Sequence, residues 1–153
     1  MTRFVTITGP RDIEQVPQRR LVELFEAYLA PFATAASHFY LGGAAGIDTV
    51  ALGWLAEHSH AELTVVAPAR MVDQPEVAQE EVTRLSAAGR LAELVELGAA
   101  GLGRDAFHAR NRWMVDRSSL VVGFPMNDDP ASGTWYTLNY GAEQGTARLV
   151  VPL

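Results

Sequence analysis

The sequence predicts an α/β domain in which a mostly parallel β-sheet is covered by helices on both faces. Short apolar runs rich in β-branched residues alternate with longer segments of helical period along the whole chain. The clearest strand-like runs, residues 63–67 and 119–124, are apolar in nearly every position, as is typical of strands buried on both faces. Glycine or proline closes most of these runs. Regular alternation of strand and helix favours parallel strands joined by helical crossovers.

The predicted elements follow one another without an internal repeat, a linker or a low-complexity stretch. The predicted strands are residues 3–9, 38–41, 63–67, 119–124 and 147–152, and the predicted helices are residues 17–31, 47–58, 77–88, 106–116 and 133–144. Residues 91–97 fit either a weaker strand or the end of a helix, and residues 98–103 form a glycine-rich loop. We therefore expect one domain over residues 1–153, a Rossmann-like three-layer sandwich.

Composition removes several kinds of chemistry. The 153 residues are 48% apolar, enough for a core, and contain no cysteine, which excludes disulfides, thiolate metal sites and cysteine nucleophiles. All 12 basic residues are arginines, so a Walker-type or Schiff-base lysine is impossible, and a phosphate clamp must use arginine, backbone N–H groups or hydroxyls. With four histidines and no cysteine, we expect no metal and no resident cofactor.

Net charge and hydropathy indicate which partners and which cellular location to expect. The formal net charge is −6, which disfavours a protein that coats nucleic acid through bulk charge but leaves room for a small basic pocket. No charged-then-apolar leader precedes the first predicted strand, and no apolar run reaches the roughly 18–20 residues of a membrane span. We expect a cytoplasmic protein with no membrane partner.

The first candidate site is the turn Leu-Gly-Gly-Ala-Ala-Gly-Ile-Asp at residues 41–48, between a predicted strand and a predicted helix. Glycines let a ligand approach the backbone closely, and the free N–H groups and dipole of a helix start favour an anion. The alternative is a tight turn in which Asp48 caps its helix.

Three further segments suit phosphate. Residues 110–112 (Arg-Asn-Arg) place two arginines at i and i+2 of a helix, where they point to different sides, so one can face a ligand. Residues 132–134 (Ser-Gly-Thr) supply hydroxyls and N–H groups at a helix start, although a plain N-cap also favours serine and threonine. Residues 8–11 (Thr-Gly-Pro-Arg) place an arginine after the first strand. All four features fall at strand carboxyl ends or near them, where parallel sheets bind ligands.

Other candidates have structural interpretations. The loop at residues 98–103 is expected to be a flexible connection, and Trp54 and Trp113 are expected in the core. Trp135, beside the Ser-Gly-Thr turn, is the best candidate for a base-stacking tryptophan.

Together these motifs, in this order and over nearly the whole chain, resemble the SLOG superfamily. That group includes DNA-processing protein A (DprA), the LOG nucleotide hydrolases and small YspA-like proteins. The segments at 8–11, 42–48, 110–112 and 132–134 are similar to its Gly-x-Arg, Gly-x-Ala-x-Gly-Ile-Asp, Arg-Asn-Arg and Ser-Gly-Ser/Thr elements. The resemblance implies a nucleotide or nucleotide-derived ligand and, by analogy, a homodimer.

Two departures from the superfamily favour a binding module over its known activities. DprA relatives usually carry arginine at the position of Ala45, and LOG enzymes carry a glutamate at the position of Thr137. The alternatives that the resemblance leaves open are a DprA-like protein that binds single-stranded DNA and a LOG-like hydrolase of N-glycosidic bonds.

The leading hypothesis assigns no catalytic residue. Backbone and hydroxyl groups at the two helix starts would hold phosphate, and Arg11 with either Arg110 or Arg112 would neutralise it. The full candidate set is Gly9, Arg11, Gly42, Gly43, Ala44, Gly46, Asp48, Arg110, Asn111, Arg112, Ser132, Gly133 and Thr134.

Overall fold

The computed structural model describes all 153 residues, and strands alternate with helices as the sequence predicts. The strands are β1 (Arg3–Thr8), β2 (Ser37–Leu41), β3 (Glu62–Ala67), β4 (Glu93–Glu96), β5 (Leu120–Gly123) and β6 (Ala147–Val150). The α-helices are α1 (Gln18–Tyr28), α2 (Ile47–His58), α3 (Glu76–Ala87), α4 (Arg104–Asp116) and α5 (Gly133–Glu143). Two single-turn 3₁₀ helices, Ala30–Phe32 and Met71–Asp73, precede β2 and α3. None of the helices is long and apolar enough to span a membrane.

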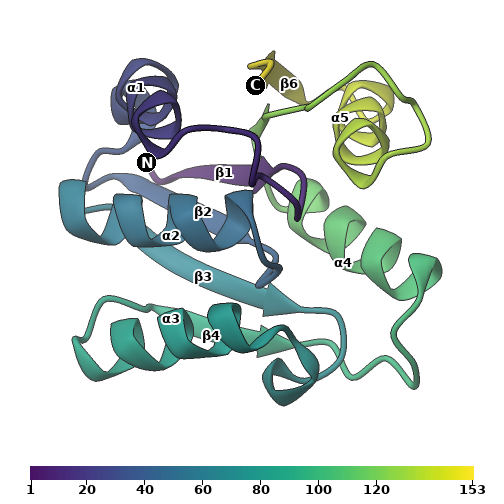
Figure 1. Cartoon of the computed structure of the whole chain (residues 1–153), viewed down its shortest axis with the longest axis horizontal. Coiled ribbons are helices and arrows are strands. Elements are labelled where there is room, and N and C mark those ends of the chain that lie inside the picture. Colours follow the sequence, from purple (N-terminus) through teal and green to yellow (C-terminus); the bar gives the residue numbers. More distant parts are fainter.

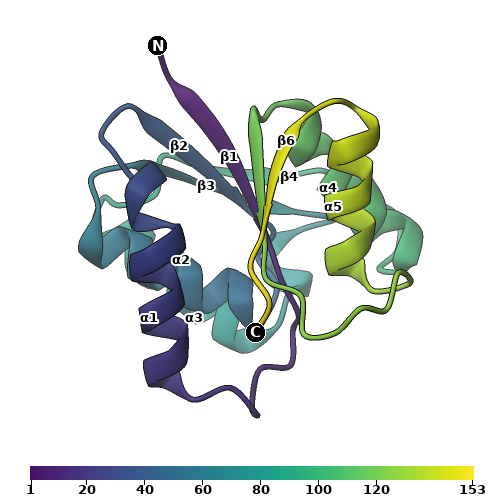
Figure 2. The ribbon, with the colours of Figure 1, turned by 90° about the horizontal axis from the view of Figure 1, so that it is seen from above.

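The six strands form one sheet in the order β4-β3-β2-β1-β5-β6, and every pair is parallel. Helices α1, α2 and α3 cover one face, and α4 and α5 cover the other (Figures 1 and 2). The predicted three-layer α/β architecture is confirmed, with a sheet that is entirely parallel.

The two faces of the sheet are packed differently. The largest core, 24 buried residues, lies between the sheet and α1–α3, where Phe25 meets the ring of Phe124 edge-on at 5.5 Å. On the other face, smaller clusters form around Met114 of α4 and Leu138 of α5. The α1–α3 layer therefore contributes most of the hydrophobic stabilisation, while α4 and α5 are free to carry polar side chains.

The ambiguous segment at residues 91–97 contains the short edge strand β4. It pairs only with β3, with Leu94 opposite Val65, and Glu93, Leu94 and Glu96 are exposed. An edge strand with little buried surface lacks the apolar pattern of a central strand, which explains its weak sequence signal.

The strand order reverses between β1 and β5. From β1 the chain adds β2, β3 and β4 outward on one side, then returns with β5 on the other side of β1, where Thr8 is paired with Gly123. In open parallel sheets the crevice at such a reversal, beyond the carboxyl ends of the strands, is where ligands bind.

Candidate functional site

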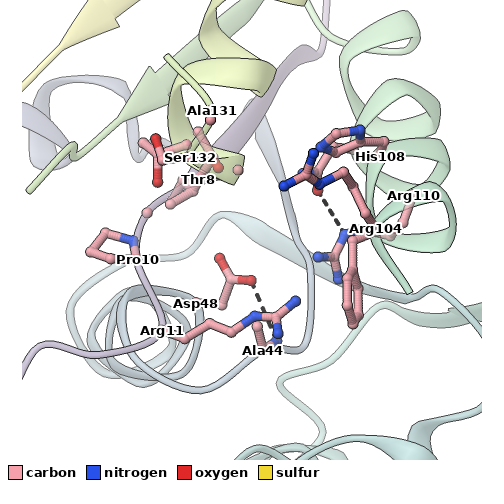
Figure 3. A pocket seen from close by; sticks show the side chains of 16 residues that line it. Thr8, Pro10, Arg11, Ala44, Asp48, Arg104, His108, Arg110, Ala131 and Ser132 are labelled. Atoms are coloured by element: carbon pink, nitrogen blue, oxygen red, sulfur yellow. Dashed lines mark hydrogen bonds between the residues drawn. The ribbon is translucent and has the colours of Figure 1, made fainter. Parts of the chain in front are cut away.

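A cleft of about 480 Å³ opens at this reversal, beyond the carboxyl end of β1. The loop after β1, the start of α2, one face of α4 and the start of α5 surround it (Figure 3). Its lining comprises Ile7, Thr8, Gly9, Pro10, Arg11, Ala44, Asp48, Arg104, Phe107, His108, Arg110, Asn111, Ala131, Ser132, Gly133 and Thr134. All four segments that the sequence indicated contribute to it.

The start of α5 presents unpaired backbone donors to the cleft. Ser132 is the N-cap, and its Oγ accepts a hydrogen bond of 3.3 Å from the backbone N–H of Trp135. The N–H groups of Gly133 and Thr134 lie in the first turn, where no intrahelical acceptor exists, and they have no other partner. A Cβ at Gly133 would meet nothing within 4 Å, so this turn is open. It combines free donors with the positive end of the helix dipole.

Arg110 is the buried cation of the cleft, with 4% of its surface exposed. Its Nε donates to Asn111 Oδ1 at 2.7 Å, and its Nη1 donates to the carbonyl oxygen of Gly42. Its Nη2 has no protein partner, which leaves one end of the guanidinium available to a ligand. These bonds fix a planar, permanently charged group at the edge of the cleft.

Asp48 is the only carboxylate that lines the cleft. Burial raises its pKa from 3.8 to about 6, against the opposing influence of the Arg110 charge. The expectation that Asp48 caps its own helix is wrong. The N-cap of α2 is Gly46, without a side-chain cap, and Asp48 Oδ2 instead accepts a long bond of 3.4 Å from the backbone N–H of Ala44.

The rim of the cleft is cationic and aromatic. The Arg11 guanidinium carbon lies 4.0 Å from the centroid of the Phe107 ring, a cation–π contact that joins the β1 loop to α4. Arg104 is exposed at the same rim. Three arginines therefore face one carboxylate in a chain whose net charge is −6.

Helix α4 also places a histidine in the cleft. His108 stacks on Tyr136 of α5 with ring centroids 3.5 Å apart and an interplanar angle of 4°. Burial, helped by the charges of Arg104 and Arg112, lowers the pKa of His108 below its ordinary value of 6.5, which favours the neutral ring.

The structure separates the two arginines of the Arg-Asn-Arg element, as the helical spacing predicts. Arg110 and Asn111 line the cleft, whereas Arg112 does not. Arg112 Nη1 donates to the hydroxyl of Tyr136 at 2.7 Å and so fastens α4 to α5. Arg112 is therefore placed to support the seam between the helices and not to contact a ligand in the cleft.

Gly9 and the glycines of the turn at residues 41–48 allow segments of the chain to pack closely against one another. A Cβ at Gly9 would lie 2.5 Å from Ile47 Cβ, and one at Gly46, where φ is +78°, would strike the backbone of Pro10 and Arg11. Gly42 accommodates the Arg110 guanidinium in the same way. Gly42, Gly43 and Gly46 lie outside the lining of the cleft. The expected phosphate cradle at this turn is thus a close contact between segments, and only Ala44 and Asp48 of the motif reach the cleft.

Three residues that α4 contributes to the cleft are outside the predicted set: Arg104, Phe107 and His108. With Asn111 they occupy i, i+3, i+4 and i+7 of α4, which is one helical face. The spacing was visible in the sequence, but the helix was expected to begin at residue 106, which left Arg104 in a loop. Trp135 lies outside the lining, and its Nε1 donates to the carbonyl oxygen of Asn127 at 2.6 Å.

No three His, Asp or Glu side chains lie close enough together to hold a metal ion. The chemistry of the cleft is therefore that of its arginines, one carboxylate, one histidine and the start of α5.

Comparison with known proteins rests on structure, because no protein-family profile and no curated protein matches the sequence. DNA processing protein A from Streptococcus pneumoniae superposes with a TM-score of 0.72 at 19% identity over 99% of this chain. DNA processing protein A from Helicobacter pylori gives a TM-score of 0.69 at 18% identity over 99% of this chain, and the protein TM1055 gives 0.60 at 15% over 96%. The chain therefore shares the fold of DNA processing protein A, as the resemblance implies.

The chain is shorter than these proteins. It spans 51% of the S. pneumoniae protein, 66% of the H. pylori protein and 72% of TM1055. The H. pylori structure is described by its single-stranded DNA binding mode. At 15–19% identity the likeness shows the fold, and the ligand of this chain has to be argued from its own cleft.

Proposed function

We propose that this chain is a binding module for a nucleotide or a nucleotide-derived ligand, with the ligand phosphate between the start of α5 and Arg110. The observation that carries the proposal is the convergence, at the reversal of strand order, of an open helix start and a buried arginine with one unpaired end. Backbone N–H groups at a helix start and an arginine fork are the two donor sets that proteins most often present to phosphate.

The size and charge of the cleft fit a small anion better than a bulk polyanion. About 480 Å³ lies within the usual range of small-molecule pockets. Three arginines line the cleft with one carboxylate, while the chain as a whole carries −6. A nucleoside monophosphate meets both conditions, since its charge is concentrated on one phosphate.

Gly133→Ala tests the placement of the phosphate. The new methyl group meets no protein atom within 4 Å and replaces a helical glycine, so the fold should keep or gain stability. The methyl group would project at the open turn, so titration calorimetry should show weaker binding of nucleoside monophosphates. Gly101→Ala, in an exposed loop with equally free space, is the matched control and should leave binding unchanged. Equal affinity for nucleosides and their monophosphates would contradict the proposal.

Two alternatives share this cleft. Similarity to a protein known for single-stranded DNA binding, together with the cationic rim, favours a DNA phosphate as the second candidate ligand. A LOG-like hydrolase is the third, and it would depend on Asp48, the one carboxylate present.

We also propose a homodimer, by analogy with the superfamily, and a cytoplasmic location. Light scattering coupled to size-exclusion chromatography measures the oligomeric state, and a monomer at micromolar concentration would contradict the proposed dimer.

A further inference from the structure

A second cavity of about 330 Å³ adjoins the cleft. The two share Arg11, Ala44 and Phe107, so the Arg11–Phe107 contact lies at their boundary. On its far side the second cavity is lined by Asp73 and Gln74, which precede α3, and by Leu102 of the glycine-rich loop. We name this space the Gln74 compartment.

We propose that the Gln74 compartment binds the base of the nucleotide and that it selects guanine. The proposal rests on the proposed function, in that it assumes a phosphate in the adjoining cleft. It is argued from the chemistry of three side chains that the phosphate site does not use.

Gln74 is a buried residue whose amide oxygen lines the compartment. It is 6% exposed, and its Nε2 donates to the carbonyl oxygen of Gly43 at 2.9 Å. That bond fixes the orientation of the amide, so its Oε1 is an accessible acceptor in a fixed position, where a ligand N–H can reach it.

Asp73 adds a charged acceptor to the same compartment. Its carboxylate is held by Arg70, whose Nε and Nη2 donate to it at 3.2 and 3.3 Å. Each carboxylate oxygen has a further lone pair, so the ion pair orients the group and leaves it able to accept from a ligand. The compartment therefore adds one carboxylate and one amide to the cleft, and the carboxylate can only accept.

The remaining surface suits a flat, uncharged ring. Phe107 offers an aromatic ring, and Leu102, 46% exposed in the loop, offers an apolar side chain that gains from being covered. Apart from Arg11 at the boundary, no cation lines the compartment. Asp73 would repel a phosphate from this compartment. We therefore expect the phosphate to stay in the cleft and the uncharged base to enter the compartment.

Guanine is the base that best matches the Asp73 carboxylate. Its Watson–Crick edge carries adjacent donors, the N1–H and the 2-amino group, which two carboxylate oxygens can accept together. Adenine and cytosine present one amino group beside a ring nitrogen acceptor, which would face the carboxylate unfavourably. Uracil has a single N–H between two carbonyl oxygens. Hypoxanthine keeps the N1–H but lacks the 2-amino group, so it should bind with intermediate strength.

The test is a calorimetric comparison of ribose 5-phosphate with the monophosphates of guanosine, inosine, adenosine and uridine. Guanosine monophosphate should bind about tenfold or more tightly than ribose 5-phosphate, because each hydrogen bond to a charged acceptor adds about 1.5–3 kcal/mol, or tenfold and above. Inosine monophosphate should lie between the two. The adenosine and uridine monophosphates should stay close to ribose 5-phosphate.

Asp73→Asn should remove about tenfold of the guanosine monophosphate affinity and leave ribose 5-phosphate binding unchanged. Glu80→Gln, an exposed carboxylate on α3 outside both spaces, is the charge-matched control and should change neither. If Asp73→Asn fails to fold, Leu102→Ala in the exposed loop provides the second variant and should weaken all nucleotides but not ribose 5-phosphate. Equal affinity for guanosine and adenosine monophosphates would overturn the base assignment alone. Failure of every phosphate, ribose 5-phosphate included, would overturn the proposed function.

Discussion

The guanidinium of Arg110 lies directly against the backbone of Gly42. A Cβ at residue 42 would stand 2.6 Å from Arg110 Cζ and 2.8 Å from Asp48 Oδ2, and the Gly42 carbonyl oxygen accepts a bond from Arg110 Nη1. The absence of a side chain at position 42 thus lets the turn after β2, the start of α2 and the middle of α4 meet. The buried cation of the cleft and the glycine motif are one structural unit.

Gly42→Ala should therefore disturb the cleft indirectly, by displacing Arg110. The methyl group would displace a buried, hydrogen-bonded guanidinium, so we expect a loss of about 1–3 kcal/mol in the free energy of unfolding, as for overpacked cores. Affinity for phosphate should fall as well, because Arg110 can no longer reach it. Urea denaturation and calorimetry measure the two effects. Gly101→Ala should show neither, and a Gly42→Ala protein with unaltered affinity would show that Arg110 does not contact the ligand.

This glycine also shows how far the sequence could be interpreted. Alternation of strand and helix was enough to predict the layers and the sheet edge at which the site lies. The same glycine signal, however, marks either a close ligand or a close segment of the chain itself, and only tertiary structure distinguishes Gly42 and Gly46 from an open position such as Gly133.

The side chains of α4 show a second limit. The sequence predicted that Arg110 and Arg112 point to different sides but not which one faces inward, because that depends on how the helix is rotated against the sheet. Arg104 was missed because helix boundaries are weakly encoded when a glycine-rich loop precedes them.

The two arginines should respond differently to replacement. Arg110→Ala should weaken the binding of nucleoside monophosphates by about 1.5–3 kcal/mol, the value of a charge-assisted hydrogen bond. Arg112→Ala should leave affinity unchanged and lower the melting temperature slightly, since it loses only the bond to Tyr136. Calorimetry and thermal melting on both variants check this. Because Arg110 offsets the buried Asp48 charge, the double variant with Asp48→Asn controls for misfolding. Equal affinity in the double variant and in Asp48→Asn alone would exclude Arg110 as a phosphate ligand.

Anion affinity should depend on pH through Asp48. The folded-state pKa of about 6 lies above the ordinary 3.8, so Asp48 takes up a proton as the pH falls through 6, and the cleft loses its one negative charge. Sulfate, whose own charge is constant in this range, should bind more tightly at pH 5 than at pH 7. The same shift means that folding favours the protonated form, so Asp48 should contribute a rise in unfolding free energy between pH 6 and pH 4.

The contribution of Asp48 to the pH profile can be distinguished from those of the other charged groups at the cleft. A guanidinium stays charged throughout this pH range. The pKa of His108 is lowered, and its protonation as the pH falls adds positive charge, which acts in the same direction as Asp48. Asp48→Asn should flatten most of the sulfate profile, and His108→Gln should flatten the remainder. A profile unchanged by Asp48→Asn would mean that the anion does not bind near this carboxylate.

Random single-stranded DNA should bind weakly. The net charge of −6 opposes the approach of a polyanion, and affinity should fall further as salt rises because the release of counterions from DNA gains less free energy at higher salt. Fluorescence anisotropy with a labelled oligonucleotide at about 150 mM salt measures it. A dissociation constant in the nanomolar range of specific complexes would contradict this prediction and would identify DNA, and not a nucleotide, as the preferred ligand.

The last prediction is that the protein releases no appreciable free base from nucleoside monophosphates. Cleavage of an N-glycosidic bond builds positive charge on the ribose and needs a carboxylate or base at the sugar to offset that charge or activate water. Thr137, at the position of the LOG glutamate, is fully buried, and its hydroxyl donates to the carbonyl oxygen of Gly133 at 2.9 Å. Glu143 is exposed at the far end of α5, outside the cleft.

Asp48 is the remaining carboxylate that could stabilise a ribose cation or activate water, and its surroundings disfavour this role. The guanidinium of Arg110 packs beside it, so much of the field of the carboxylate is cancelled where a ribose cation would need it. Chromatography of a nucleotide panel after long incubation should therefore show base release no faster than in buffer alone. Enzyme-dependent release that disappears in Asp48→Asn, but persists in Glu143→Gln, would instead identify Asp48 as a catalytic carboxylate and the cleft as a hydrolase site.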